Sequence, residues 1–302
     1  MPSTAIDYHH VDVFADRPYT GNSLAVFVDP PALDAAQMLR ITQELRHFET
    51  IFVTTPDADD VVHARVFDLF EELAFAGHPV LGAGAVLHAG SGAAVGEERR
   101  WTIALSDRVV PVRTRADADG RVSAVLDQGR PEWIPAPDPA RRTEIAAALG
   151  LDPADLDPTL PVEVVSTGLR YLVVPVDGAD PLGRARIVHP DFGAFLAGFG
   201  AEFAYLLDAS APEGRHWNND GGLEDVATGS AAGCVAAYLL RHGLAHTGAA
   251  RTLSQGRFVG RPSTLTITAH GTAENVERIT VGGTVAMVGT GTLHAPPPPR
   301  RA

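Results

Sequence analysis

Apolar and polar positions along the chain alternate with two periods, one typical of strands and one typical of helices. Residues 7–29 show strand-like alternation on both sides of a turn at 18–22. Residues 34–46 carry apolar side chains at near-helical spacing, and Asp34 is placed to cap that helix. Further strands are expected at 49–54 and 61–67, and a helix at 79–88.

The remainder of the chain continues this mixture of elements. Strands are expected at 101–105, 109–114, 122–126, 162–165, 171–176, 202–207 and 264–269, and helices at 141–149, 190–199 and 230–243. The proline-rich stretch 130–139 suits a linker. The last strand region, 280–293, is expected to be interrupted at Gly282 and Gly283.

One segment occurs twice. Residues 72–83 (ELAFAGHPVLGA) and 224–235 (EDVATGSAAGCV) each carry a glycine that precedes a small, apolar helical stretch. Aligning Gly77 with Gly229 gives an offset of 229 − 77 = 152 residues. Weaker similarities at nearly the same spacing join 20–29 to 167–177 and 49–53 to 202–206. We interpret the chain as two copies of one domain that face each other across a cleft.

The length agrees with this interpretation, because 302 residues correspond to two domains of roughly 150 residues. We expect an N-terminal lobe at 1–130 and a C-terminal lobe at 131–280. A C-terminal strand at 281–295 is expected to pack back onto the first lobe. The proline-rich tail at 296–302 is expected to be disordered.

Charge and hydropathy limit the partners. The net charge is −13 and the chain has no basic run, whereas phosphate binding needs clustered positive charge. No apolar run approaches the roughly 20 residues that span a bilayer, and residues 1–10 lack the pattern of a secretory signal. We expect a cytoplasmic protein without nucleic-acid or membrane partners.

Two scarce residue types exclude classes of enzyme. The sequence contains no lysine, so it lacks the amine that pyridoxal-phosphate enzymes, Schiff-base aldolases and P-loop nucleotide enzymes require. The single cysteine, Cys234, excludes an intramolecular disulfide, a cysteine-rich metal site and a two-cysteine acid/base pair within one chain.

The two repeated glycines, Gly77 and Gly229, each stand before a predicted helix. Free backbone N–H groups and the helix dipole attract anions at such a position. A tight strand-to-helix turn would explain one isolated glycine, but recurrence at matched positions favours binding. We expect these two helix N-termini to hold a substrate carboxylate and to stabilise developing negative charge.

Two carboxylates near these turns are candidates for acid/base chemistry. Glu49 lies in the apolar segment 48–53, where burial would raise its pKa and suit proton transfer near neutral pH. A solvent-facing strand glutamate is the alternative. Asp225 and its neighbour Glu224 precede the second turn, and either could instead cap the helix.

Other polar residues allow several interpretations. His78 could hydrogen-bond substrate or relay a proton, or it could be a core or capping histidine. Ser230, His78 and Asp225 contain the residue types of a catalytic triad, but 228–232 is not the G-x-S-x-G elbow. Four arginines could bind an anionic substrate, although solvated surface positions are expected for them: Arg65, Arg170, Arg215 and Arg261.

With these residues the chain resembles the phenazine-biosynthesis-like PhzF family, whose members share the fold of diaminopimelate epimerase. The resemblance runs nearly end to end. It rests on motifs at 12–14, 21–26, 49–53, 75–83, 224–231, 255–256, 260–263 and 281–283.

The resemblance implies an α+β fold of two pseudo-symmetric lobes, each a curved, mostly antiparallel, barrel-like sheet wrapped around a central helix. It implies an active site between the lobes, commonly a homodimer, and no metal or organic cofactor. It also implies that Glu49 shuttles a proton, with His78, Asp225 and Ser230 at the matching site positions. Catalysis is thus expected from Glu49, His78 and Asp225, and substrate binding from Gly77, Gly229 and Ser230.

Two stretches depart from the family pattern. Val226 stands where proline usually follows the aspartate, which would loosen the turn that aims Asp225. Residues 215–219 replace an arginine-aromatic strand that ends in proline, although Arg215 and Trp217 keep part of that pattern.

The combined expectation is a cofactor-independent isomerase or epimerase that transfers a proton on a small carboxylic acid. A dihydro-hydroxyanthranilate-like compound or another secondary-metabolite intermediate is the expected substrate class. A serine hydrolase that uses Ser230, and a non-catalytic small-molecule binding protein of the same fold, are the alternatives.

Overall fold

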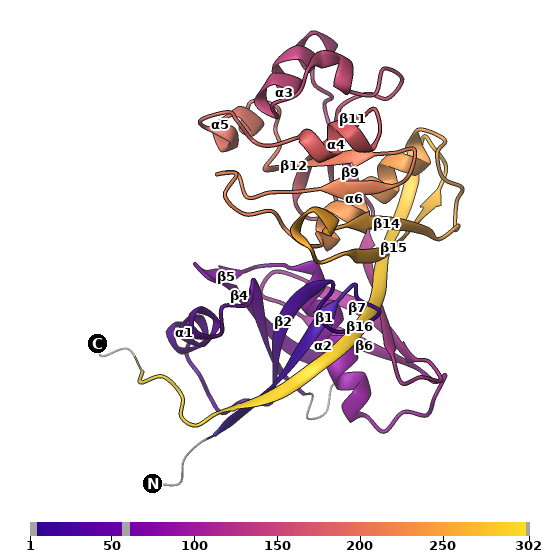
Figure 1. Cartoon of the computed structure of the whole chain (residues 1–302). Coiled ribbons are helices and arrows are strands. Elements are labelled where there is room, and N and C mark those ends of the chain that lie inside the picture. The colour runs from indigo at the N-terminus through magenta and orange to yellow at the C-terminus, as the bar shows by residue number, and fades with distance from the viewer. Residues whose placement is uncertain (1–4, 56–60, 300–302) are drawn as a thin grey trace. The chain divides into compact units, whose positions relative to one another are not determined.

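The computed structural model describes residues 5–55 and 61–299 and divides the chain into two compact units (Figure 1). Unit 1 contains residues 1–127 and 282–302, and unit 2 contains residues 128–281. The C-terminal segment therefore belongs to the same unit as the N-terminus.

Unit 1 is a sheet closed on itself. Its strands are β1 (Ile6–Val13), β2 (Asn22–Val28), β3 (Glu49–Thr54), β4 (Val61–Asp68), β5 (Glu72–Leu73), β6 (Glu98–Ala104), β7 (Val109–Ala116) and β8 (Val122–Gly129), joined by part of β16 (Val276–Leu293). The pairing order is β16-β1-β2-β3-β4-β6-β7-β8, and β8 pairs with β16 in turn. Only β2–β3 and β4–β6 pair in parallel among the registers described for this unit. Pairing round the ring leaves β1 no free edge, which is how barrels avoid exposed strand edges.

The helix α2 (Gly77–Gly90) is the core of unit 1. Its residues 77–88 are all buried, and it contacts β1, β2, β3, β6 and β7. A helix buried on every side must be apolar all round. Two glycines let the strands approach closely, because a Cβ at Gly82 would overlap Leu24 Cδ2 and one at Gly84 would lie 2.9 Å from Val112 Cγ1. The small residues of this helix are therefore a packing requirement.

The helix α1 (Ala35–Leu45) is amphipathic and contacts β3 and β4. Asp34 caps it, accepting a hydrogen bond from the backbone N–H of Gln37, as the sequence predicted. The C-terminal tail also contacts this helix, because Gln37 Nε2 donates to the Pro297 carbonyl over 2.6 Å. The rest of the tail that was expected to be disordered, 300–302, lies outside the described residues.

Unit 2 repeats the strand order of unit 1. Its strands are β9 (Glu132–Ile134), β10 (Glu163–Ser166), β11 (Arg170–Val176), β12 (Phe203–Asp208), β13 (Glu213–Arg215), β14 (Arg251–Gln255) and β15 (Ser263–Gly271), followed by β16. The parallel pairs β11–β12 and β13–β14 occupy the same places in the order as β2–β3 and β4–β6. The predicted α+β fold of two pseudo-symmetric lobes is confirmed.

The helices of unit 2 cover its sheet and fill its centre. They are α3 (Arg142–Ala148), α4 (Ala179–Arg184), α5 (Phe192–Ala197) and α6 (Gly229–Arg241). Residues of α3, α4 and α5 share one apolar core with β10, β11 and β12. The helix α6 corresponds to α2, since its residues 229–240 are all buried.

Some local predictions were wrong or incomplete. The expected linker at 130–139 contains β9, whose three residues pair with β10. The expected interruption at Gly282 does not occur, because β16 runs continuously and the glycine instead admits the Ala124 carbonyl. The elements β13, β14 and α4 were not predicted, because at three to six residues each is too short to show a periodic pattern.

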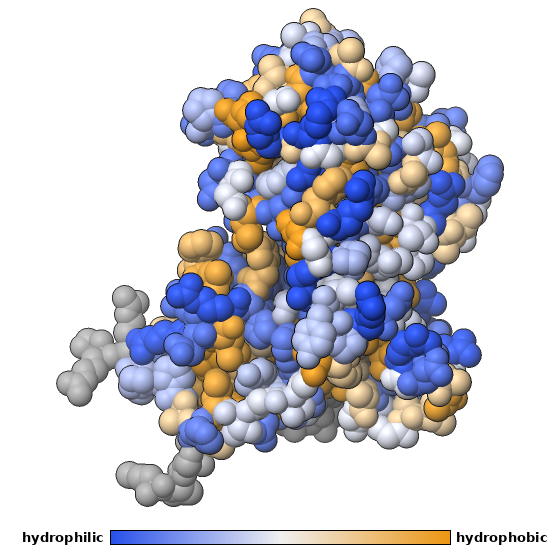
Figure 2. Space-filling view, in the orientation of Figure 1, coloured by the Kyte–Doolittle hydropathy of each residue, from blue (hydrophilic) through white to orange (hydrophobic). Residues whose placement is uncertain are grey.

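Exposed large apolar side chains occur in both units. Figure 2 shows apolar side chains interspersed with polar ones, and large exposed apolar residues include Tyr19, Phe70, Val188 and Leu223. Singly exposed apolar residues are ordinary on a protein surface. Within 5–55 and 61–299, no helix is long and apolar enough to cross a bilayer.

Candidate active site

In unit 1, Glu49 and His78 meet where β3 and α2 begin. Glu49 is the first residue of β3 and stands beside Leu24 of β2 and Asp68 of β4. His78 is the second residue of α2, and its Nδ1 lies 3.4 Å from Glu49 Oε2. The two side chains are only 6% and 12% exposed. The structure thus joins two of the predicted catalytic residues in a nearly buried pair.

The imidazole of this pair is neutral near pH 7. Burial lowers the pKa of His78 to about 3. Its Nε2 is buried and has no hydrogen-bond partner among the described residues. A neutral imidazole donates through one nitrogen and accepts through the other, so His78 can contact Glu49 through one nitrogen and offer the other to a ligand.

Both central helices begin without a side-chain cap. The residue before α2 is Ala76, which has no side chain able to cap, and the residue before α6, Thr228, makes no capping bond. The first backbone N–H groups of a helix need acceptors, so these groups can serve a ligand. The alternative that Glu224 or Asp225 caps α6 through its side chain is wrong, since neither takes the cap position.

In unit 2, Asp225 is buried and held in place by the turn that leads to α6. The Thr228 hydroxyl donates to Asp225 Oδ2 over 2.7 Å. Burial raises the pKa of Asp225, and the charge of His216 and the Thr228 hydrogen bond partly offset this effect.

The side-chain amide of Gln255 holds the same turn through four hydrogen bonds. Its Nε2 donates to the Asp225 carbonyl and to Thr228 Oγ1, both over 2.9 Å. Its Oε1 accepts from the Thr228 N–H over 3.1 Å and from the Tyr205 hydroxyl over 3.0 Å. Gln255 was not among the predicted site residues, and its only signal in the sequence is its place in the family motif at 255–256.

Alternation in a short ribbon separates Glu224 from Asp225. Trp217 pairs with Glu224 across this ribbon, and the Asp225 N–H donates to the His216 carbonyl over 2.9 Å. Neighbouring residues of an extended chain face opposite sides. Glu224 therefore shares its side with Trp217, whereas Asp225 shares its side with His216.

Arg215 anchors the Glu224 side of the ribbon. Its guanidinium makes a two-pronged ion pair with Glu224, with Nε–Oε1 at 2.9 Å and Nη2–Oε2 at 2.6 Å. It also packs against the rings of Trp217 and Phe258. The expectation of a solvated Arg215 is wrong, because this buried ion pair satisfies its charge.

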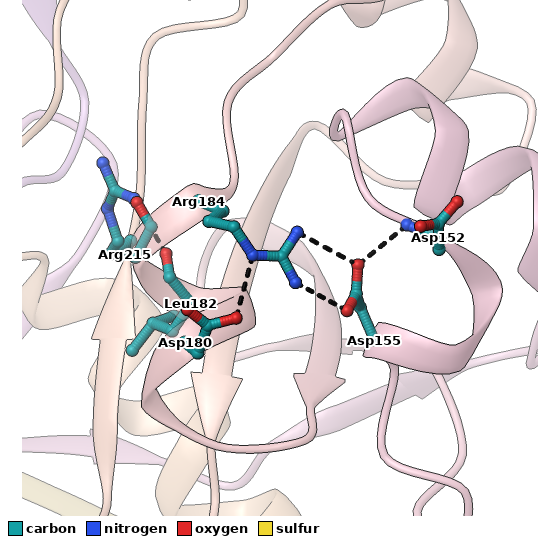
Figure 3. Close-up of polar contacts among 7 residues, drawn as sticks. Asp152, Asp155, Asp180, Leu182, Arg184 and Arg215 are labelled. Carbon is teal, nitrogen blue, oxygen red and sulfur yellow. Dashed lines mark hydrogen bonds and ion pairs between the residues drawn. The ribbon is translucent and has the colours of Figure 1, made fainter.

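The C-terminal end of helix α4 also binds the Arg215 guanidinium. Arg215 Nη1 donates to the carbonyls of Leu182, Gly183 and Ala185 at the end of α4. Figure 3 shows Arg184 of the same helix reaching Asp180 and Asp155, with Nε–Oδ2 at 2.9 Å and Nη2–Oδ1 at 2.8 Å. Contacts therefore connect α4 to Arg215 and Arg215 to Glu224, which is the residue next to Asp225.

Ser230 and two of the candidate arginines are engaged in contacts of other kinds. Ser230 Oγ lies 2.9 Å from the Tyr171 hydroxyl, and among the described residues it bonds to no histidine. This geometry lacks the base that a serine nucleophile needs. Two other candidate arginines are paired, Arg65 with Glu72 and Arg170 with Glu202.

Comparisons with known proteins agree with this fold and these motifs. A solved structure of a predicted epimerase from Pseudomonas aeruginosa is 47% identical, with a TM-score of 0.86 over 95% of this chain and 99% of that one. Trans-2,3-dihydro-3-hydroxyanthranilate isomerase from P. aeruginosa is 34% identical over 95% of this chain and 99% of its own length. An uncharacterized isomerase, YddE of Escherichia coli K12, is 30% identical over 93% of this chain and 95% of its own length.

These relatives are named isomerases or epimerases, so the protein is an isomerase. The family model for phenazine biosynthesis-like proteins, PhzC-PhzF, matches residues 11–291, and the chain belongs to this family. The resemblance noted in the sequence is confirmed.

Proposed function

We propose that this isomerase moves a proton on the carbon skeleton of a small carboxylic acid, with Glu49 as the acid/base group. The carrying observation is the nearly buried contact between Glu49 and a neutral His78 at the start of α2. A carboxylate in such surroundings is shielded from water, which favours proton transfer to and from carbon.

The reaction balances without a co-reactant. Glu49 takes a proton from a C–H bond next to a carbonyl group or a double bond, and the electron pair of that bond spreads into the conjugated system. The protonated Glu49 then returns the proton to another carbon of that conjugated system. Neither oxidation nor group transfer is involved, so the product is an isomer of the substrate.

His78 and the backbone N–H groups of the helix starts have supporting roles. His78 Nδ1 orients the Glu49 carboxyl group, and its buried Nε2 is available to the substrate. The uncapped N–H groups at Gly77, at the start of α2, bind the substrate carboxylate and stabilise the charge that develops on it. Gly229, at the start of α6 in unit 2, offers uncapped N–H groups of the same kind. Within unit 2, Asp225 and Ser230 are the polar residues predicted to contact substrate.

A dihydro-hydroxyanthranilate is the first substrate to test. Three relatives named trans-2,3-dihydro-3-hydroxyanthranilate isomerase are 33%, 33% and 34% identical to this chain over 94–95% of its length. This similarity supports a cyclic, unsaturated carboxylic acid as the substrate class.

The test is deuterium uptake from D₂O, followed by NMR on trans-2,3-dihydro-3-hydroxyanthranilate and related cyclic acids. Glu49→Gln should lower the rate by about 10²- to 10⁴-fold, since the amide cannot carry the proton. Glu72→Gln, a change of the same kind at a half-exposed position paired with Arg65, serves as the control and should retain the rate. Full activity in Glu49→Gln would contradict the role of Glu49, and no uptake by the wild type would contradict proton transfer on these acids.

A further inference from the structure

Four consecutive prolines, 296–299, follow the last strand and take no part in the proposed reaction. We call residues 294–299, with the sequence HAPPPP, the proline segment. Proline fixes its own φ near −65° and holds the residue before it in an extended conformation. Consecutive prolines therefore favour the polyproline II helix, whose carbonyl groups have no partners within the segment. Such a segment offers hydrogen-bond acceptors and loses little conformational freedom when it binds.

Two donors of α1 bind carbonyl groups of this segment. Gln37 Nε2 donates to the Pro297 carbonyl over 2.6 Å, and Arg40 Nη1 donates to the Pro298 carbonyl over 2.9 Å. Gln37 and Arg40 are three residues apart in the helix, so they lie on one face of it. Two successive carbonyls of the proline segment are thus matched by two neighbouring donors of α1.

The helix cap orients the Gln37 side-chain amide. Its Oε1 accepts a hydrogen bond from the Asp34 N–H over 2.9 Å, while Asp34 Oδ1 accepts one from the Gln37 N–H over 2.8 Å. Because the cap holds Oε1, the direction of the Nε2 donor is also set. This donor therefore needs little ordering to bind a carbonyl group, which lowers the cost of binding.

The last strand brings the proline segment to α1. Leu293, the final residue of β16, packs against the apolar cluster that includes Met38 and Ile41 of α1. Figure 1 shows the yellow C-terminal segment continuing from β16 toward α1. The first two prolines of the run are half-buried and the last two are exposed. Apolar packing therefore holds the start of the segment, and hydrogen bonds hold its prolines.

We propose that the face of α1 that carries Gln37 and Arg40 is a binding site for proline-rich peptides in the polyproline II conformation. The proline segment of the same chain occupies this site. Because the segment is tethered a few residues away, its effective concentration is roughly millimolar, and a peptide from another molecule must compete with it. The proposal does not depend on the reaction assigned to Glu49.

The first test releases the proline segment in the full-length chain. Gln37→Glu keeps the oxygen that the helix cap uses, but it replaces the donor to Pro297 with a carboxylate oxygen. Arg40→Ala removes the second donor. In each variant the ¹H–¹⁵N heteronuclear NOE of the Ala295 amide should fall below its wild-type value, because the segment moves more freely.

Gln43→Glu is the matched control for Gln37→Glu. Gln43 lies on the same helix, but its side chain donates to the Leu69 carbonyl. The heteronuclear NOE of Ala295 should therefore keep its wild-type value in this control. An unchanged NOE in both Gln37→Glu and Arg40→Ala would overturn the proposal.

The second test supplies the peptide from outside. The full-length protein is prepared with four substitutions: Pro296→Gly, Pro297→Gly, Pro298→Gly and Pro299→Gly. This variant keeps the carbonyl groups of the segment but loses its extended preference, which should weaken the intramolecular contact by about tenfold or more. The synthetic peptide HAPPPP should then cause saturable shifts of the α1 amides and of the Gln37 side-chain amide in ¹H–¹⁵N spectra. The wild type should need about tenfold more peptide, because its own segment competes.

Two controls make the peptide test specific. Adding Gln37→Glu to the four-glycine variant should abolish the shifts, and the peptide HAGGGG should bind about tenfold more weakly than HAPPPP. Absence of saturable shifts in α1 of the four-glycine variant would overturn the proposal. Equal binding of the two peptides would also overturn it, since the site would then not recognise proline.

Discussion

Glu224 and Asp225 are adjacent acids with different fates, and only their environments separate them. In the extended ribbon, Glu224 lies on the side of Arg215 and forms an ion pair with it. Asp225 lies on the opposite side, with His216, and accepts a hydrogen bond from Thr228. His78 shows the same dependence on surroundings, because burial alone makes it a neutral hydrogen-bonding group. At the scale of the residue, the neighbours that surround a side chain therefore determine its charge and its hydrogen bonds.

Protonation of His78 should contribute to acid unfolding. The pKa of His78 is about 3 in the folded protein against 6.5 normally, so below pH 6.5 the unfolded chain takes up a proton that the folded chain refuses. This contribution to the unfolding free energy is complete above pH 6.5 and is lost progressively toward pH 3. The loss amounts to about 2 kcal/mol at pH 5. Urea unfolding at pH 7 and pH 5 should show a smaller pH dependence for His78→Gln than for the wild type.

The exposed His246 supplies the control for this comparison, since His246→Gln should keep the wild-type pH dependence. Equal pH dependence in the wild type and in His78→Gln would show that His78 is not held neutral in the folded state.

At the scale of the element, the small residues of helix α2 are explained by the strands packed around it. The helix α2 is surrounded by strands of one closed sheet, and side chains of those strands leave no room for a methyl group at Gly82 and Gly84. Helix propensity alone would favour alanine at each of these positions by about 1 kcal/mol. Close packing therefore outweighs propensity inside the barrel, at Gly82 and Gly84, whereas Gly90 has no neighbour that would exclude alanine.

Two alanine substitutions in α2 should separate these effects. Gly82→Ala would force a methyl group against Leu24, Val13 and Val11, and we expect a loss of about 1–3 kcal/mol of unfolding free energy. Gly90→Ala, at the end of the same helix, meets nothing within 4 Å and should be neutral or slightly stabilising. Denaturant unfolding measures both, and equal effects would refute the packing explanation.

At the scale of the whole chain, the C-terminal strand completes the N-terminal unit. β16 pairs with β1 from Leu293 beside Ile6 to Val285 beside Val13, with one irregularity at His10. It also pairs with β8, so the ring of unit 1 closes only after the last strand has been made. Such long-range pairing makes the unit dependent on both ends of the sequence. The homodimer expected from the family resemblance remains a prediction.

Truncation should reveal this dependence. A chain that ends at Val281 leaves β1 without its partner strand, because β1 pairs with residues 285–293 of β16, and we expect loss of cooperative unfolding and aggregation through the exposed edge. A chain that ends at Leu293 keeps the strand and loses only tail contacts such as Gln37 with Pro297, so it should remain folded. Circular dichroism melting and size-exclusion chromatography distinguish the two, and a folded, monodisperse product from the shorter chain would contradict the role of β16.

The sequence by itself determined the long elements, the internal repeat and the family motifs, because periodicity and local spacing carry them. Asp34 as a cap and Glu49 as a nearly buried strand acid followed from such local patterns. Tertiary structure alone decided that Arg215 is buried and that His216 Nδ1 bonds to the Ala204 carbonyl, because these partners come from distant segments, α4 and β12. It also decided the short strands β9 and β13, since a three-residue strand depends on the hydrogen bonds of its neighbours rather than on a pattern of its own.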